Sequence, residues 1–274
     1  MLSMKMPHPK LLHFAALAMA LVSLAATPLR AVPADGTDLE YKDGETVLEG
    51  YVARPLTKDL IKRPAVLIVH NWMGLKDYEK NRAKMVAELG YVAFAIDIYG
   101  KGVRPQDAKE AGALATKYKT DVPLYRERLK AALDELLKRP DVDPKRVAIA
   151  GYCFGGTGAL ELARSGADVV GAATFHGGLA TKTPEDAKNI KGSILVMHGA
   201  LDPYANFEEV TAFKKEMDDA KVDYQLVLYS GAVHSFTEKE AGDDITKGAA
   251  YNENADKRSW KLFTSWLEEI FAEK

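Results

Sequence analysis

The only cysteine of the chain, Cys153, stands in a glycine-rich segment whose spacing suits a nucleophile. Residues 151–156 read Gly-Tyr-Cys-Phe-Gly-Gly and follow an apolar run at 146–150. This is the Gly-x-nucleophile-x-Gly pattern of a sharp strand-to-helix turn, where larger side chains would collide with the neighbouring strand and helix. The following helix N-terminus is electropositive and favours a thiolate. Two other interpretations are a small buried thiol at a tight junction and, more weakly, a phosphate loop, which lacks its Lys-Ser or Lys-Thr pair.

Two later residues would complete a nucleophilic site. Asp202 lies on a turn after the apolar run 193–198, and His234 lies in a loop of small residues after the run 224–229. Taken singly, Asp202 could be a turn residue before a proline, and His234 could be a surface histidine. Their order is the stronger signal, because nucleophile, acid and base follow one another in this order in α/β-hydrolases. We therefore predict a triad in which His234 takes the proton of the Cys153 thiol and Asp202 orients the imidazole.

The loop at 70–74, which reads His-Asn-Trp-Met-Gly, follows another apolar run. In this architecture such a loop supplies one backbone N–H to an oxyanion hole, and the residue after the nucleophile supplies the other. The backbone amides of Trp72 and Phe154 are the predicted donors. The remaining strand-end histidines show no metal-ligand spacing, so we expect no metal and no cofactor, and we assign packing or pocket lining to His70, His176 and His198.

The elements that must position these residues alternate along the chain. The apolar runs 65–69 and 91–96 fit strands buried on both faces of a parallel sheet, and further strands are expected at 146–150, 169–175, 193–198 and 224–229. Helices are expected at 77–89, 105–119, 123–137, 157–164, 207–219 and 255–271, with a hairpin over 38–55 and a chain break at 140–144. This alternation predicts an α/β-hydrolase fold, with a mainly parallel central sheet and helices on both faces.

Composition excludes several classes of function. The chain has 274 residues, a net charge of -2, 28% charged and 47% apolar residues, which is ordinary for a soluble globular protein. This near-neutral balance gives no electrostatic reason to expect nucleic acid or an anionic membrane as a partner. A lone cysteine forms no internal disulfide and has no second cysteine to resolve an oxidised thiol, which weighs against a redox protein. A monomer that takes a small-molecule substrate is expected.

The N-terminus resembles an export signal. Lys5 and Lys10 precede an uncharged apolar run at 11–26, and small residues at 25–34 offer cleavage sites. We predict a signal peptide and the start of a linker over 1–31, and a single mature domain over 32–274 in the periplasm or outside the cell. The alternative is an uncleaved anchor, but the run is shorter than the roughly 20 residues of a membrane span. After cleavage, no stable membrane span is expected.

The turn at 151–156, Asp202 and the stretch 234–236 resemble the dienelactone hydrolase family, and the likeness runs from about 66 to 271. A cysteine in place of the usual serine is its most specific point. The resemblance implies hydrolysis of small esters or lactones through an acyl-enzyme, without metal or cofactor. The alternative from another class of protein is an exported binding protein that keeps the scaffold but turns nothing over.

The sequence departs from the family pattern at two places. The founding members carry a glutamate where this chain has Asn71, and that glutamate is thought to hold the resting thiol. Asn71 forms hydrogen bonds but cannot take a proton, so we predict that it modulates the thiol in another way. The family also carries an arginine for a substrate carboxylate a few residues after the histidine. Here Thr237 and Glu238 stand instead, which disfavours dienelactone itself as a substrate.

Overall fold

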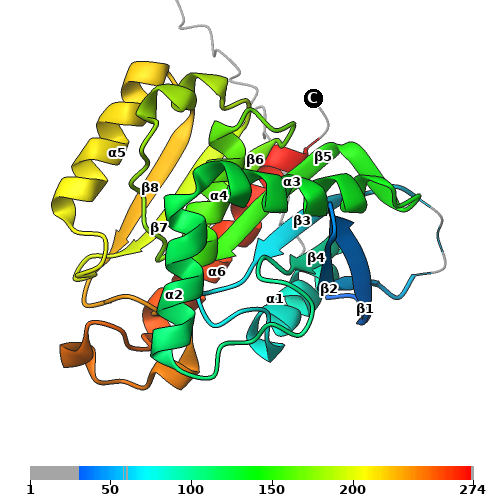
Figure 1. The fold of residues 1–274 in the computed structure, drawn as a ribbon. Coiled ribbons are helices and arrows are strands. Elements are labelled where there is room, and N and C mark those ends of the chain that lie inside the picture. The colour runs from blue at the N-terminus through cyan, green and yellow to red at the C-terminus, as the bar shows by residue number, and fades with distance from the viewer. Residues whose placement is uncertain (1–30, 58, 60, 273–274) are drawn as a thin grey trace, which may run out of the picture. The chain divides into compact units, whose positions relative to one another are not determined.

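The computed structural model describes residues 31–57, 59 and 61–272 (Figure 1), so the predicted export signal lies outside the described residues. In this part of the chain, one eight-stranded sheet has the order β1-β2-β4-β3-β5-β6-β7-β8. β1 and β2 form an antiparallel hairpin, β2 is antiparallel to β4, and all other neighbours are parallel. The strands are β1 Ala34–Asp43, β2 Thr46–Pro55, β3 Arg63–Val69, β4 Val92–Ile96, β5 Val142–Tyr152, β6 Gly171–Phe175, β7 Ser193–Gly199 and β8 Tyr224–Tyr229.

Helices cover both faces of this sheet (Figure 1). One face packs against α1 Asp77–Glu88 and α6 Glu253–Phe271. The opposite face packs against α2 Ala108–Thr120, α3 Val122–Leu137, α4 Phe154–Arg164 and α5 Phe207–Ala220. Short 3-10 turns occur at η1 Pro184–Asn189, η2 Lys239–Ala241 and η3 Ile245–Lys247. The predicted α/β-hydrolase architecture is therefore confirmed. None of the described helices is long and apolar enough to cross a membrane.

The apolar strands divide their side chains between two cores. In β3, Leu67 and Val69 join the core under α2–α5, whereas Val66 and Ile68 join the core under α1 and α6. Successive side chains of a strand point to opposite faces, so a run that is apolar throughout supplies both layers. All four side chains are essentially inaccessible to solvent. This double burial holds the carboxyl edge of the sheet, where the predicted site residues follow the strands.

Several boundaries differ from the sequence-based expectation, and three of them have a clear local cause. The break expected at 140–144 is wrong, because β5 begins at Val142 and includes Pro144. Its pairing with β3 jumps from Arg63↔Val142 to Ala65↔Val147, and proline is tolerated at such an irregularity because no ladder hydrogen bond is required there. α2 begins at Ala108 instead of 105, because the Asp107 side chain accepts two backbone N–H groups and caps it. α4 begins at Phe154 rather than at 157, directly after the cysteine.

Candidate active site

Cys153 lies at the tip of a turn that the flanking glycines make possible. The residue has a positive φ of 53°, an uncommon conformation for a residue with a side chain. A methyl group on Gly151 would lie 1.9 Å from the Gly155 carbonyl oxygen, and one on Gly155 would lie 2.3 Å from the Val69 carbonyl oxygen. β5 and α4 can therefore approach this closely only with glycine at both places. The turn leaves the Cys153 side chain half-buried at the carboxyl edge of the sheet.

Three side chains that are far apart in the sequence form one hydrogen-bonded chain in space. The His234 Nε2 atom lies 3.0 Å from the Cys153 Sγ atom, and its Nδ1 atom lies 2.7 Å from an oxygen of Asp202. The Asp202 side chain is fully buried, and its other oxygen accepts the Tyr204 N–H at 2.8 Å. The backbone of His234 is fixed on both sides, because its N–H donates to Gly248 and its carbonyl accepts from Ala250. The structure thus brings the predicted triad residues together.

The electrostatic balance of this chain favours a charged imidazole. Burial alone would lower the pKa of His234, but the Cys153 sulfur and the Asp202 carboxylate raise it to about 10. The opposing effects are of unequal size, because two negative partners contact the two ring nitrogens directly. The contacts with Cys153 and Asp202 therefore favour the protonated form of His234. In general, an imidazolium beside a cysteine favours the thiolate, which is the reactive form of a cysteine nucleophile.

The two predicted oxyanion donors lie in the loop after β3 and at the start of α4, two segments that approach each other at Gly155. Phe154 is the first residue of α4, and its carbonyl accepts the Tyr125 hydroxyl at 3.0 Å. Trp72 lies in the loop after β3, and its carbonyl accepts the Tyr99 hydroxyl at 2.9 Å. Neither amide N–H has an acceptor among the described residues. Both groups are therefore available to a ligand, as an oxyanion hole requires.

Asn71 contacts two glutamates, of which sequence reasoning missed one. Its side-chain Nδ2 atom donates to Glu238 at 2.9 Å, and its backbone N–H donates to Glu79 at 3.2 Å. The pKa of each carboxyl is raised to about 7, chiefly by burial, and the charge of Glu238 contributes to the rise at Glu79. Glu79 looked like an ordinary acidic residue in the first turn of α1. Its second hydrogen bond, from the Lys76 N–H, is the capping interaction that such a position indicates.

The other strand-end histidines hold loops in place. His70 donates from Nδ1 to the Asn71 carbonyl at 2.5 Å and accepts the Ile98 N–H on Nε2, and burial lowers its pKa to about 4. His176 packs against the ring of His234 and contacts the Thr237 hydroxyl at 2.7 Å. His198 contacts the Ala205 carbonyl at 2.8 Å. These contacts fix the loops that carry the site residues, as the packing interpretation expects.

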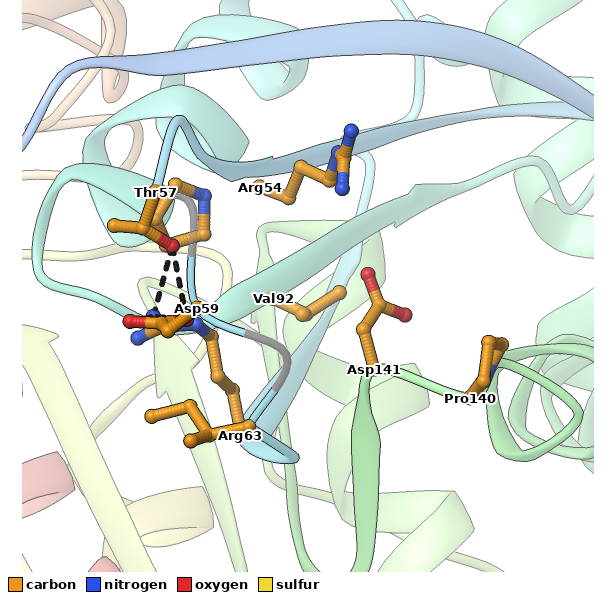
Figure 2. Close-up of a pocket in the computed structure, with 9 residues that line it drawn as sticks. Arg54, Thr57, Asp59, Arg63, Val92, Pro140 and Asp141 are labelled. Atoms are coloured by element: carbon orange, nitrogen blue, oxygen red, sulfur yellow. Dashed lines mark hydrogen bonds and ion pairs between the residues drawn. The ribbon is translucent and has the colours of Figure 1, made fainter.

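Two cavities differ in their relation to the triad. One of about 280 Å³ is lined by Tyr125, Thr157, Gly178 and Tyr204, and the Tyr204 ring lies 5.1 Å from that of His234. The other, of about 320 Å³, lies where β3, β4 and β5 begin. Its wall carries the ion pair of Arg63 with Asp59 (Figure 2), and no predicted site residue lines it. The first cavity therefore borders the triad through Tyr204, although none of the three triad residues lines it.

Comparison with known proteins identifies the family. The model of the dienelactone hydrolase family matches residues 48–271. A Bradyrhizobium protein named "Probable 2-oxo-3-(5-oxofuran-2-ylidene)propanoate lactonase" is 30% identical over 80% of this chain and 92% of its own. The solved structure of m3DLH is 37% identical with a TM-score of 0.84, and that of a dienelactone hydrolase-like promiscuous phosphotriesterase from metagenomic libraries is 38% identical with a TM-score of 0.83. Each comparison covers 88% of this chain and 100% of that structure. The chain belongs to the dienelactone hydrolase family.

Proposed function

We propose that this protein hydrolyses small carboxylic esters or lactones through an acyl-enzyme on Cys153. The observation that carries the proposal is the continuous hydrogen-bonded chain from the Cys153 sulfur through His234 to the buried Asp202 carboxylate. Two backbone amides without an acceptor among the described residues support it: Phe154 follows Cys153 directly, and Trp72 lies in the loop after β3, whose first residues pack against the elbow at Gly155. Family membership supports the reaction class, and the lactonase name of one relative supports lactones among the substrates.

The reaction would proceed in two steps. The thiolate attacks the carbonyl carbon, so that a C–S bond forms and the carbonyl oxygen becomes an oxyanion held by the two amides. The C–O bond then breaks, and the imidazolium of His234 gives its proton to the leaving alkoxide. In the second step His234 takes a proton from water, which attacks the thioester, and Cys153 leaves again as thiolate. Asp202 keeps the Nδ1 proton of His234 in place throughout.

The side of the site that carries Asn71 disfavours anionic substrates, whereas Lys119 and Lys182 line the cavity beside Tyr204. Glu238 lies beside Asn71 in the position where a substrate carboxylate would need a cation. The exposed aromatic rings nearby belong to Trp72 and Tyr204. An acid and aromatic surface together favour neutral, apolar acyl or alkoxy groups over carboxylate-bearing lactones.

Ester turnover by the purified protein tests the proposal. We expect release of acid from small activated esters and lactones, total loss in Cys153→Ala, and a trace of activity in Cys153→Ser. Mass spectrometry after brief exposure to an activated ester should show one acyl group on Cys153. Full activity in Cys153→Ala would refute the mechanism, and absence of turnover by the unaltered protein would favour the alternative of a binding protein.

A second activity, hydrolysis of neutral phosphotriesters, is also proposed. The observations that favour it are the 38% identity to a promiscuous phosphotriesterase and the acid Glu238, which disfavours anions but not neutral triesters. Sγ would attack phosphorus, the aryloxide would leave, and water would then cleave the S–P bond. An aryl dialkyl phosphate should release its aryloxide in a reaction that Cys153→Ala abolishes. No release above the rate of Cys153→Ala would refute this second activity.

We also propose that the chain is exported. Support comes from Lys5, Lys10 and the apolar run 11–26, followed by small residues. Expression of the full chain in a bacterium should place a shortened form in the periplasm or the medium, with a new N-terminus between 25 and 34. A form lacking residues 1–31 should stay in the cytoplasm. A full-length product in the membrane fraction would support an uncleaved anchor instead.

A further inference from the structure

A hydrogen bond joins the loop after β3 to the loop that carries His234. Glu238 stands four residues after His234, and its Oε2 atom accepts the Asn71 Nδ2 group at 2.9 Å. Its other oxygen, Oε1, is buried and has no hydrogen-bond partner in the described part of the chain. Burying a carboxyl oxygen without a hydrogen-bond partner costs free energy. Other contacts of Glu238 must offset this cost and keep the carboxyl in place. We call the Asn71–Glu238 contact the bridge.

Asn71 passes this constraint on to Trp72. The Asn71 side-chain oxygen accepts the Met73 N–H at 2.8 Å, and its backbone carbonyl accepts the Gly74 N–H at 3.3 Å. The residues before and after Trp72 are therefore tied to one another, and the Trp72 carbonyl is fixed by the Tyr99 hydroxyl. The Trp72 N–H belongs to the same peptide unit as the Asn71 carbonyl, which His70 and the Gly74 N–H also hold. Glu238 acts on this unit through the Asn71 side chain, so it contributes to the direction of the Trp72 N–H.

We propose that Glu238 is a positioning residue, which through Asn71 sets the direction of the Trp72 amide relative to Cys153 and His234. The inference rests on the proposed function, because it assigns Glu238 a task in that reaction. It also gives the Asn71 position its role. Asn71 cannot exchange a proton with the thiol, but it connects the oxyanion loop with the loop of the base.

The charge of Glu238 makes this role depend on pH. The titratable and charged groups that face it are His234, Glu240, Glu79, Arg82, Tyr78 and Tyr152. Burial raises the pKa of Glu238 to about 7, although the charge of His234 and the bridge itself lower it. By reciprocity, ionised Glu238 stabilises the imidazolium of His234, and it accepts a stronger hydrogen bond from Asn71 than the neutral acid does. Both effects improve the site as the pH rises through about 7.

The ratio of kcat/KM between the unaltered protein and Glu238→Gln, followed from pH 5.5 to 8.5, tests the inference. Glutamine has the size and the acceptor of the neutral acid, so the ratio should be about one at pH 5.5 and rise to about five at pH 8.5. Asp243→Asn, which removes an exposed carboxylate five residues away that is not among the groups facing Glu238, should match the unaltered protein at every pH. A ratio that stays constant with pH would overturn the inference, because a purely structural loss does not follow an ionisation.

A double-mutant cycle provides a second, independent measurement. Asn71→Ala and Glu238→Ala each break the bridge, so the double variant should lose no more kcat/KM than the worse single variant. If the losses of kcat/KM multiply, for example about tenfold in each single variant and about a hundredfold in the double variant, the inference is overturned. Thermal unfolding of every variant separates loss of folding from loss of positioning. If the unaltered protein shows no turnover that depends on Cys153, the proposed function fails, and the role of Glu238 fails with it.

Discussion

Replacing Asp202 with asparagine should place the wrong tautomer of His234 against the thiol. One Asp202 oxygen accepts the Tyr204 N–H at 2.8 Å, and the other contacts the His234 Nδ1 atom at 2.7 Å. Only the carbonyl oxygen of an asparagine can accept the Tyr204 N–H, so its NH₂ group must face His234. The Nδ1 atom then becomes an acceptor, and the neutral ring carries its proton on Nε2, 3.0 Å from Cys153. Such a ring cannot take the thiol proton.

The size of the effect follows from the burial of this contact. The Asp202 side chain is fully buried, so water does not replace the lost charge. A hydrogen bond to a charged group is worth roughly 1.5–3 kcal/mol, which corresponds to about 10- to 150-fold in rate. The partners of His234 hold its pKa at about 10. At pH 6 we therefore expect His234 to be an imidazolium in the unaltered protein and a neutral ring in Asp202→Asn.

Alkylation of Cys153 by iodoacetamide, measured by mass spectrometry from pH 5 to 9.5, reads this proton directly. We expect the unaltered protein to react at pH 6 at nearly its maximal rate, whereas an isolated thiol ionises only near pH 8.5. Asp202→Asn should react about 10- to 150-fold more slowly at pH 6 and approach the unaltered protein above pH 9. Identical pH profiles for the two proteins would refute the reasoning.

Three further predictions concern packing, charge and the cavity. Gly151→Ala should lower the free energy of unfolding in urea by about 3 kcal/mol or more, since the new methyl group would lie 1.9 Å from a backbone oxygen. The control Gly112→Ala in α2, where no atom lies within 4 Å of the new methyl group, should raise it by about 0.5–1 kcal/mol. Equal effects of the two substitutions would contradict the steric argument. Burial raises the pKa of Glu238 from 4.5 to about 7, so its contribution to stability is present below about pH 4.5 and is lost as the pH rises through 7. The unfolding free energy of the unaltered protein should therefore fall between pH 5 and 8, and in Glu238→Gln this fall should be smaller by up to about 3 kcal/mol. An equal fall in both proteins would count against the burial effect. Tyr204→Ala should raise KM for aryl esters about tenfold with little change in kcat, through about 1.5 kcal/mol of lost apolar contact in the cavity; a loss confined to kcat would contradict this assignment.

The parts of the fold that the sequence predicts well are those that repeat a local signal. The run 65–69 is both short and uninterrupted, as in a strand buried on both faces, whereas the run 224–229 contains Gln225 and forms the partly exposed edge strand β8. The glycines at 151 and 155 predicted the tight turn for the steric reason that the structure shows. The boundary at Pro144 was wrong because a register shift between β3 and β5 accommodates the proline, and such a shift depends on pairing with a distant strand.

The candidate site shows the same division. Cys153, Asp202 and His234 could be nominated because each follows a strand, and parallel strands end at one edge of the sheet. Their mutual hydrogen bonds follow from that topology. The direction in which each side chain points does not follow from the topology. The two oxyanion amides could be named only from the known architecture of the fold.

The bridge between Asn71 and Glu238 lies beyond any local pattern, because 167 residues separate its partners. Taken alone, each residue was a departure: an amide in place of an acid, and an acid in place of a cation. In space the two departures compensate, since the acid that the loop after β3 lacks is supplied from the loop after β8 and contacts the same position. A substitution at one of these positions should therefore be tolerated best when the other changes with it. Asn71→Asp alone would face Glu238 with a second buried carboxylate, and we expect it to lower kcat/KM above pH 7 more than Asn71→Asp combined with Glu238→Gln. Equal losses in the two variants would show that the positions act independently.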